Sequence, residues 1–264
     1  MRIPVQDAEI EVQVHEGSGP WILLVHGLGG SSRAWDSLVP FLSSQARVVV
    51  PDLRGCGAST RGTRPYTLAL VAEDLGRVVR GLGIERCIAV GHSLGGVIVQ
   101  ELLASEPEWL CGAVLISTSS RVGEKAAENW RRLADTVEQR GLGDSPAAAA
   151  RGFAEQYAEA HPDVVAAYAR LGASADRHVY AEQARAASSY DYSKALAAVR
   201  CPVLVLQGLA DRLTPPGGSV LLHRALPAHA RLEMIEEAGH NLPIEMPALV
   251  ARLIVEFARQ ASSD

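Results

Sequence analysis

The chain has 264 residues, 48% of them hydrophobic, and a formal net charge of −5 at pH 7. This length and apolar content allow a large core, in one large α/β domain or in one domain with an insertion. The mild negative charge and the lack of a lysine–arginine cluster in the sequence give no indication of a nucleic acid or an anionic membrane as partner. The expected partner is a small molecule, and the sequence leaves the oligomeric state open.

The cysteines and the first residues of the chain bear on metal binding and location. Four scattered cysteines form no C-x-x-C pair and have no metal-ligand spacing: Cys56, Cys87, Cys111 and Cys201. We therefore expect buried reduced thiols, no bound metal and no cofactor. Residues 1–20 lack a basic start followed by an apolar segment, and no apolar run reaches the length of a membrane span. These features predict a cytoplasmic protein.

Strand and helix patterns alternate along most of the chain. Strands are predicted over residues 3–5, 9–15, 21–25, 47–50, 87–90, 112–116, 202–207 and 231–235. Helices are predicted between them over residues 33–43, 68–82, 97–104 and 218–226, and at the end over 247–261. This alternation predicts an α/β fold with a mostly parallel central sheet flanked by helices. Functional sites in such sheets lie at the carboxyl ends of the strands.

Residues 119–199 break this alternation. They contain helix-like segments rich in alanine, glutamate and arginine, at 124–140, 145–160, 163–171 and 179–189, and no clear strand. An all-helical insertion in an α/β domain is a natural lid, which shapes a pocket and excludes water. We therefore predict a core formed by residues 1–118 and 200–264 with a helical lid at 119–199. A helical elaboration without a gating role is the alternative.

One serine stands at the junction of a predicted strand and a predicted helix. The spacing Gly91-x-Ser93-x-Gly95 is the nucleophile-elbow pattern, in which a sharp strained turn exposes the serine hydroxyl. The neighbours two positions away must be small because the turn holds unfavourable backbone angles. Since glycine and serine are common in loops, the pattern alone also fits a turn without chemistry. The strand before it and the helix after it favour the catalytic interpretation.

An aspartate and a histidine follow two other predicted strands at the same edge of the sheet. A serine hydroxyl is a poor nucleophile unless a base lies within hydrogen-bond reach, and an acid must orient that base. Ser93, Asp211 and His240 occur in the chain order serine, acid, histidine. His26 and His92 adjoin the site but are better interpreted as supporting residues than as the base.

The motifs along nearly the whole chain resemble those of the α/β-hydrolase superfamily. They are the segments 26–30, 52–59, 91–96, 208–211, and 239–240 followed by Glu245 and Pro247. By this resemblance Ser93 is the nucleophile, His240 the general base and then acid, and Asp211 its orienting carboxylate. The resemblance also implies an oxyanion hole made of the backbone N–H groups of Leu28 and Leu94. One departure is Cys56, where relatives often carry histidine.

The chain length and helical lid are similar to those of small esterases, enol-lactonases and cofactor-free haloperoxidase-like hydrolases. We therefore expect a serine hydrolase that cleaves a small carboxylic ester or lactone through an acyl-enzyme. Carbon–carbon bond hydrolysis and perhydrolase activity on the same triad are alternatives. A non-catalytic ligand-binding protein is a more distant one, because a fold does not fix a function.

The predicted lid also holds the candidate pocket residues. Trp130, Tyr157 and Tyr190 are the first candidates, although helical spacing alone does not say which side chains face a pocket. Further apolar or aromatic candidates are Leu133, Phe153, Tyr168 and Tyr180. Three lid arginines are candidates for binding a carboxylate-bearing lactone, or else are ordinary solvated surface residues: Arg131, Arg132 and Arg185.

Overall fold

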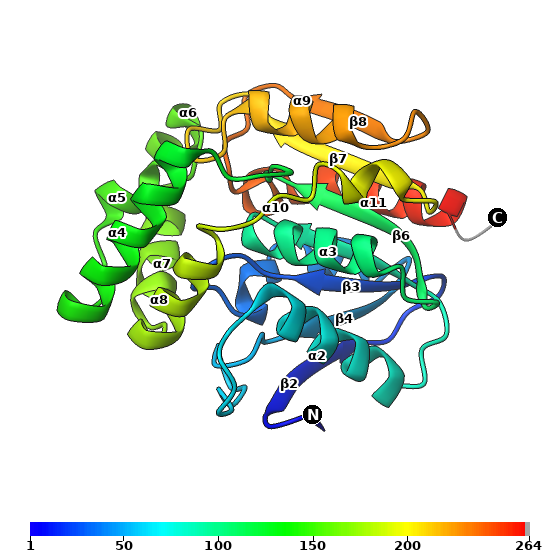
Figure 1. Cartoon of the computed structure of the whole chain (residues 1–264). Coiled ribbons are helices and arrows are strands. Elements are labelled where there is room, and N and C mark those ends of the chain that lie inside the picture. The colour runs from blue at the N-terminus through cyan, green and yellow to red at the C-terminus, as the bar shows by residue number, and fades with distance from the viewer. Residues whose placement is uncertain (262–264) are drawn as a thin grey trace.

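A single mixed sheet forms the centre of the molecule. The computed structural model describes residues 1–261. Its strands are β1 (Arg2–Pro4), β2 (Glu9–His15), β3 (Trp21–Val25), β4 (Arg47–Pro51), β5 (Cys87–His92), β6 (Leu110–Ile116), β7 (Val203–Gly208) and β8 (Arg231–Ile235). They lie side by side in the order β1-β2-β4-β3-β5-β6-β7-β8 (Figure 1). The pairs β1–β2 and β2–β4 are antiparallel, and the other neighbouring pairs are parallel.

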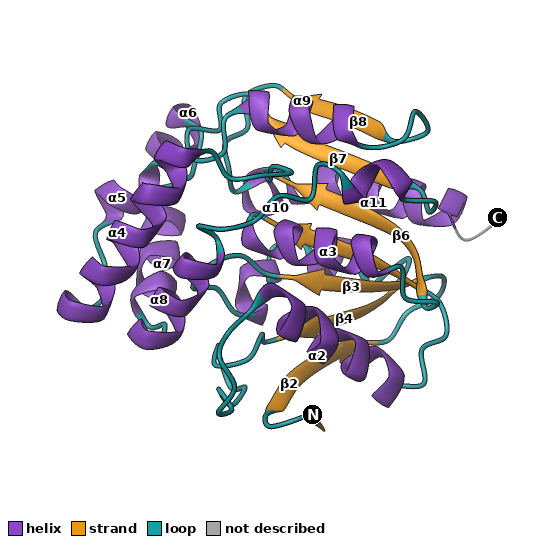
Figure 2. Cartoon of the chain, viewed as in Figure 1, coloured by secondary structure: helices purple, strands orange, loops and turns teal. Residues whose placement is uncertain are grey.

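Helices cover both faces of this sheet (Figure 2). One face carries α2 (Leu68–Gly81), α3 (Leu94–Ser105) and α9 (Pro216–Ala225). The other carries η1 (Ser32–Trp35), α1 (Val39–Leu42), α10 (Leu242–Glu245) and α11 (Pro247–Ala261). Successive side chains of a strand point to opposite faces, so Leu23 and Val25 pack in the first layer and Ile22 and Leu24 in the second. Burial on both faces explains the continuous apolar runs of the central strands.

The segment between β6 and β7 is helical, apart from one isolated bridge. It contains α4 (Glu124–Arg140), α5 (Pro146–Ala150), α6 (Glu155–Ala160), α7 (Pro162–Ala173), α8 (Arg177–Ala186) and η2 (Ala195–Ala198). Figure 1 shows α4 to α8 beyond the carboxyl ends of the parallel strands. The bridge between Arg121 and Asp191 brings the start and end of this insertion together. Its helices therefore lie over the edge of the sheet where the sequence predicts the site.

Two predicted helices differ from the observed ones. The helix expected over 33–43 is instead η1 and α1, because Pro40 has no N–H and its ring would clash inside a continuous helix. The helix expected over 145–160 is interrupted at residues 151–154, where Phe153 is buried. In the described part of the chain, no helix has the length and apolar character needed to cross a membrane.

Candidate active site

Ser93 occupies a strained turn between β5 and α3. Its backbone lies at φ 55° and ψ −119°, a region that an L-residue adopts at a cost of roughly 1–3 kcal/mol. A Cβ atom on Gly91 would lie 2.3 Å from the carbonyl oxygen of Gly95, and one on Gly95 would lie 2.0 Å from that of Val25. The glycines are therefore required because the elbow folds back on itself and against β3.

Asp211 and His240 form a buried pair in the loops after β7 and β8. The Nδ1 of His240 lies 2.9 Å from Oδ2 of Asp211, and both side chains are nearly inaccessible to solvent. Burial raises the pKa of Asp211, but the hydrogen bond and charge of His240 and the N–H groups of Thr214 and Leu213 outweigh it, so the net pKa is lowered. The ionised carboxylate therefore accepts a hydrogen bond from Nδ1–H, which leaves the proton on Nδ1 and the lone pair of Nε2 to act as a base.

The two other histidines at the site are held as neutral donors and acceptors. The Nε2 of His92 donates to the carbonyl oxygen of His240 at 2.8 Å, and burial lowers the pKa of His92 to about 3. The Nε2 of His26 accepts from the N–H of Leu53 at 3.0 Å, which leaves its Nδ1 to donate to the carbonyl of Gly27. Burial also lowers the pKa of His26. Both therefore support the surrounding loops, as their sequence positions indicate.

Leu28, in the loop after β3, and Leu94, at the start of α3, line the same cavity as Ser93. Leu94 is the first residue of α3, where the helix dipole favours negative charge. Leu28 stands in a turn that the hydrogen bond from Gly30 to Gly27 closes at 3.2 Å. Among the described residues, no backbone hydrogen bond of a turn, loop or cap uses the N–H of Leu28 or Leu94. Backbone N–H groups without such a partner are able to donate hydrogen bonds to a ligand in the cavity.

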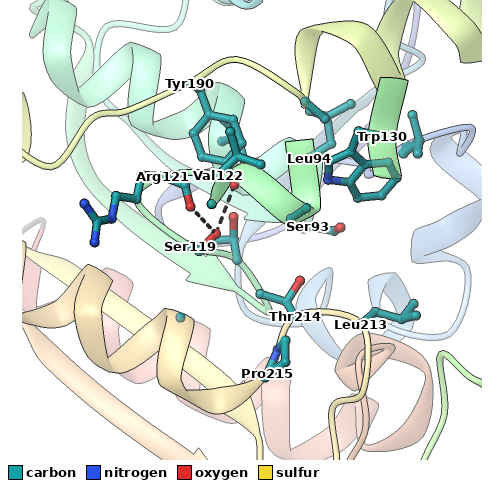
Figure 3. Close-up of a pocket in the computed structure, with 17 residues that line it drawn as sticks. Ser93, Leu94, Ser119, Arg121, Val122, Trp130, Tyr190, Leu213, Thr214 and Pro215 are labelled. Atoms are coloured by element: carbon teal, nitrogen blue, oxygen red, sulfur yellow. Dashed lines mark hydrogen bonds between the residues drawn. The ribbon is translucent and has the colours of Figure 1, made fainter. Parts of the chain in front are cut away.

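Two cavities adjoin Ser93, with volumes of about 640 and 320 Å³. His240 lines the larger one together with Tyr168 and Tyr180. The smaller one, shown in Figure 3, lies between the elbow, the insertion and the loop after Asp211. Six residues line both cavities: Leu28, Ser93, Ala126, Trp130, Leu213 and Thr214. Ser93 thus stands where the two meet.

The predicted pocket residues have different places in the structure. Trp130 lines both cavities, and Tyr190 lines the smaller one, where its hydroxyl is 3.0 Å from Oγ of Ser119. Tyr157 lines neither of these two cavities. Its ring stacks on Phe153, and its hydroxyl donates to the carbonyl of Ile244 at 3.3 Å. This side chain joins the insertion to the core.

Arg131, Arg132 and Arg185 of the insertion also lie outside both cavity linings. Arg185 is paired with Asp135 at 2.9 Å and with Glu138 at 2.6 Å, on the helices of the insertion. Arg131 and Arg132 are exposed, as expected for solvated surface residues, whereas Arg185 is ion-paired. Sequence reasoning missed Leu213 and Thr214, which line both cavities only because the loop after Asp211 turns toward Ser93.

The cysteines are free thiols in the structure. Cys56 and Cys87 are buried, as expected, whereas Cys111 and Cys201 are only partly so. Burial raises the pKa of Cys56 to about 12, which keeps the thiol protonated. Within residues 1–261, no group of three or more histidine, cysteine, aspartate or glutamate side chains has an arrangement able to hold a metal ion.

This geometry agrees with comparisons to known proteins. A family model described as alpha/beta hydrolase fold matches residues 20–247. The chain is 27% identical over 229 residues to 3-oxoadipate enol-lactonase 2 of Acinetobacter baylyi, covering 86% of this chain and 84% of that protein. It is 31% identical over 252 residues to a proposed carbamate hydrolase of Caulobacter sp., covering 89% of each.

A solved structure is similar over almost the whole chain. A thermophilic esterase from Thermogutta terrifontis, in a malate-bound structure, superposes with a TM-score of 0.91 at 29% identity. The match covers 99% of this chain and 98% of that one. The chain therefore belongs to the α/β-hydrolase family, as its motifs predict, and it is a hydrolase of that family.

Proposed function

We propose that this protein is a serine hydrolase that cleaves a small carboxylic ester or lactone through an acyl-enzyme. The observation that carries the proposal is the strained Ser93 facing the cavity that His240 also lines, with His240 hydrogen-bonded to the ionised Asp211. A nucleophile, a base and an orienting acid in one site are the parts that acyl transfer requires.

In the proposed reaction, Oγ of Ser93 attacks the substrate carbonyl while Nε2 of His240 takes its proton. The N–H groups of Leu28 and Leu94 bind the oxyanion of the tetrahedral intermediate, each contributing roughly 3 kcal/mol to lowering the barrier. The intermediate then expels the alcohol, which receives the proton from His240. A water molecule that gives its proton to His240 attacks the acyl-enzyme, and Ser93 regains a proton as the acid leaves.

The two cavities support a substrate with a group on each side of its reacting carbonyl. Both are lined largely by apolar side chains, with volumes suited to small or medium-sized groups. We assign Trp130 and Tyr190 to the walls of this substrate pocket. The family relatives named as an esterase and an enol-lactonase favour ester bonds. We also propose residues 119–199 as a lid over the core of residues 1–118 and 200–264, because this insertion supplies one side of both cavities.

The relative named as a proposed carbamate hydrolase favours a second candidate reaction, hydrolysis of a carbamate on the same triad. Carbon–carbon bond hydrolysis or perhydrolysis would use the same residues, and a ligand-binding protein would use the cavities without turnover. A panel of p-nitrophenyl esters, lactones, aryl carbamates and β-diketones separates these reactions. We expect the highest kcat/KM for an ester or lactone. Turnover of only carbamates or β-diketones would contradict the proposal, as would the lack of any turnover.

A further inference from the structure

A buried glutamine of the insertion contacts the loop that carries Leu28. Gln183 lies on α8 and is completely inaccessible to solvent. Its Oε1 accepts a hydrogen bond of 2.9 Å from the N–H of Gly29, 154 residues away in the sequence. Burying an amide side chain is unfavourable unless it is hydrogen-bonded, so this contact accounts for one end of the glutamine.

The other end of Gln183 contacts a second loop of the core. Its Nε2 donates to Sγ of Cys56 at 3.1 Å. A thiol sulfur is a weak acceptor, and burial keeps the Cys56 thiol protonated. The two contacts are therefore unequal, and the stronger hydrogen bond is the one to Gly29.

The face of α8 around Gln183 fits closely against both glycine-rich loops. A Cβ atom on Gly29 would lie 2.6 Å from the ring of Tyr180, and one on Gly55 would lie 2.6 Å from Cγ2 of Val179. Residues three and four positions apart share one face of a helix, so Val179, Tyr180 and Gln183 contact the core together. The loop after β3 is therefore packed and hydrogen-bonded by the insertion, not only by the sheet.

The hydrogen bond to Gln183 fixes the peptide group that follows Leu28. Because the N–H of Gly29 is turned toward α8, the peptide plane between Leu28 and Gly29 is held on that side. Gly29 itself has a φ of 64°. Because glycine adopts many backbone conformations easily, the residue alone does not fix the orientation of this peptide. Without Oε1 of Gln183, the buried N–H of Gly29 would lack a hydrogen-bond partner. If the peptide between Leu28 and Gly29 rotated to find another partner, the ψ angle of Leu28 would change.

We propose that Gln183 is a positioning residue for the oxyanion hole, through its hydrogen bond to the N–H of Gly29. This inference rests on the proposed hydrolase function, because it assigns the N–H of Leu28 to the oxyanion. The insertion then contributes to the chemical step itself as well as to the walls of the pocket. An oxyanion donor acts in the transition state, so the effect belongs in kcat rather than in KM.

The test is the steady-state hydrolysis of p-nitrophenyl acetate by Gln183→Met, which has nearly the same length but no strong acceptor. We expect kcat to fall by at least about tenfold, and by no more than the roughly 100- to 1,000-fold that removal of a complete oxyanion donor costs. KM should change by less than about threefold. The inhibition constant of phenylboronic acid, which forms a tetrahedral adduct with the serine, should rise in proportion. Gln183→Asn, one methylene shorter, should reproduce the loss if the Met variant does not fold.

Two control variants separate this contact from the docking of α8 in general. Glu182→Gln removes the ion pair of Glu182 with Arg61, formed at 2.5 Å between the same helix and the core, and should keep kcat within about twofold. Cys56→Ala removes the weaker contact of Gln183 and should also keep kcat. Gln183→Glu, which retains an oxygen of the same reach, should recover part of the lost kcat.

Unchanged kcat in a folded Gln183→Met or Gln183→Asn protein would overturn the inference, and so would an equal loss in Glu182→Gln. Failure of the proposed function is recognised separately, in the unsubstituted protein. If that protein has no ester turnover that depends on Ser93, both the function and this inference are wrong.

Discussion

Burial and hydrogen bonding give the histidines around Ser93 different chemical roles. His26 and His92 are enclosed and contact backbone groups, so their neutral forms are favoured. His240 instead contacts a carboxylate whose pKa is lowered, and in the proposed reaction that carboxylate would stabilise the imidazolium form of His240. The same residue type therefore serves as scaffold at two positions and as proposed base at a third.

Replacing the acid tests the orientation of His240. In Asp211→Asn, the side chain keeps an oxygen for the N–H groups of Leu213 and Thr214 but favours the wrong histidine tautomer. We expect kcat for an aryl ester to fall by about three to four orders of magnitude while the melting temperature changes little. Retention of more than a tenth of the kcat in the folded variant would argue against Asp211 as the orienting acid.

The lowered pKa of His92 predicts a pH dependence of stability. The folded protein holds this histidine neutral down to about pH 3, whereas the unfolded chain protonates it near its ordinary value of 6.5. Between these values the unfolded state binds more protons, so the free energy of unfolding decreases as the pH falls, by up to about 1.4 kcal/mol per pH unit. Urea denaturation of His92→Gln between pH 7 and 4 should show a shallower decrease than the unsubstituted protein. Equal slopes would contradict the assignment.

At the scale of secondary structure, the site depends on close contacts between backbones. The elbow approaches β3 at Gly95, and residues 152–154 of the insertion approach the loop of His240 at Gly239. Oε2 of Glu245 accepts from the N–H groups of both Gly239 and Ala154 at 2.9 Å, which joins the insertion to the loop that carries His240. These hydrogen bonds explain why the helix predicted over 145–160 is interrupted, because the tertiary contact of Ala154 with Glu245 outweighs the local helical preference.

The close approach at the elbow predicts a large effect of one added methyl group. Gly95→Ala would place Cβ 2.0 Å from the carbonyl oxygen of Val25, and we expect it to destabilise the fold by about 2–3 kcal/mol or more. Gly172→Ala is the matched control, because its Cβ would meet no atom within 4 Å and alanine favours the helix. Thermal unfolding should show a lowered melting temperature for the first variant and an unchanged or raised one for the second. The same melting temperature for both would refute this account of the elbow.

At the scale of the whole molecule, the sequence allowed the fold class and the order of the elements to be predicted. The apolar strands and amphipathic helices have strong periodic patterns, and the bounds predicted for β3, β8, α4 and α11 agree with the structure. The positions of Ser93, Asp211 and His240 were predictable because each follows a strand at one sheet edge. Their pairing geometry and the cavities needed coordinates.

Contacts between distant segments were not predictable from local patterns. Nothing in the alanine-rich sequence around Gln183 indicates that its side chain is buried against a loop 154 residues earlier. Tyr157 likewise has the composition of a pocket residue but packs on Phe153 and the core. Helical periodicity identifies an apolar face, whereas only the packing of the insertion decides whether that face meets a cavity or a neighbouring element.

The most direct test of the central claim is covalent labelling of the nucleophile. Reaction with an alkyl fluorophosphonate, followed by mass spectrometry of the intact protein and its peptides, should show one adduct per chain on Ser93, with ester turnover lost in parallel. Ser93→Ala should fold, remain unlabelled and hydrolyse p-nitrophenyl acetate at the rate of the buffer control. An adduct on another residue, or unchanged hydrolysis by Ser93→Ala, would show that Ser93 is not the nucleophile.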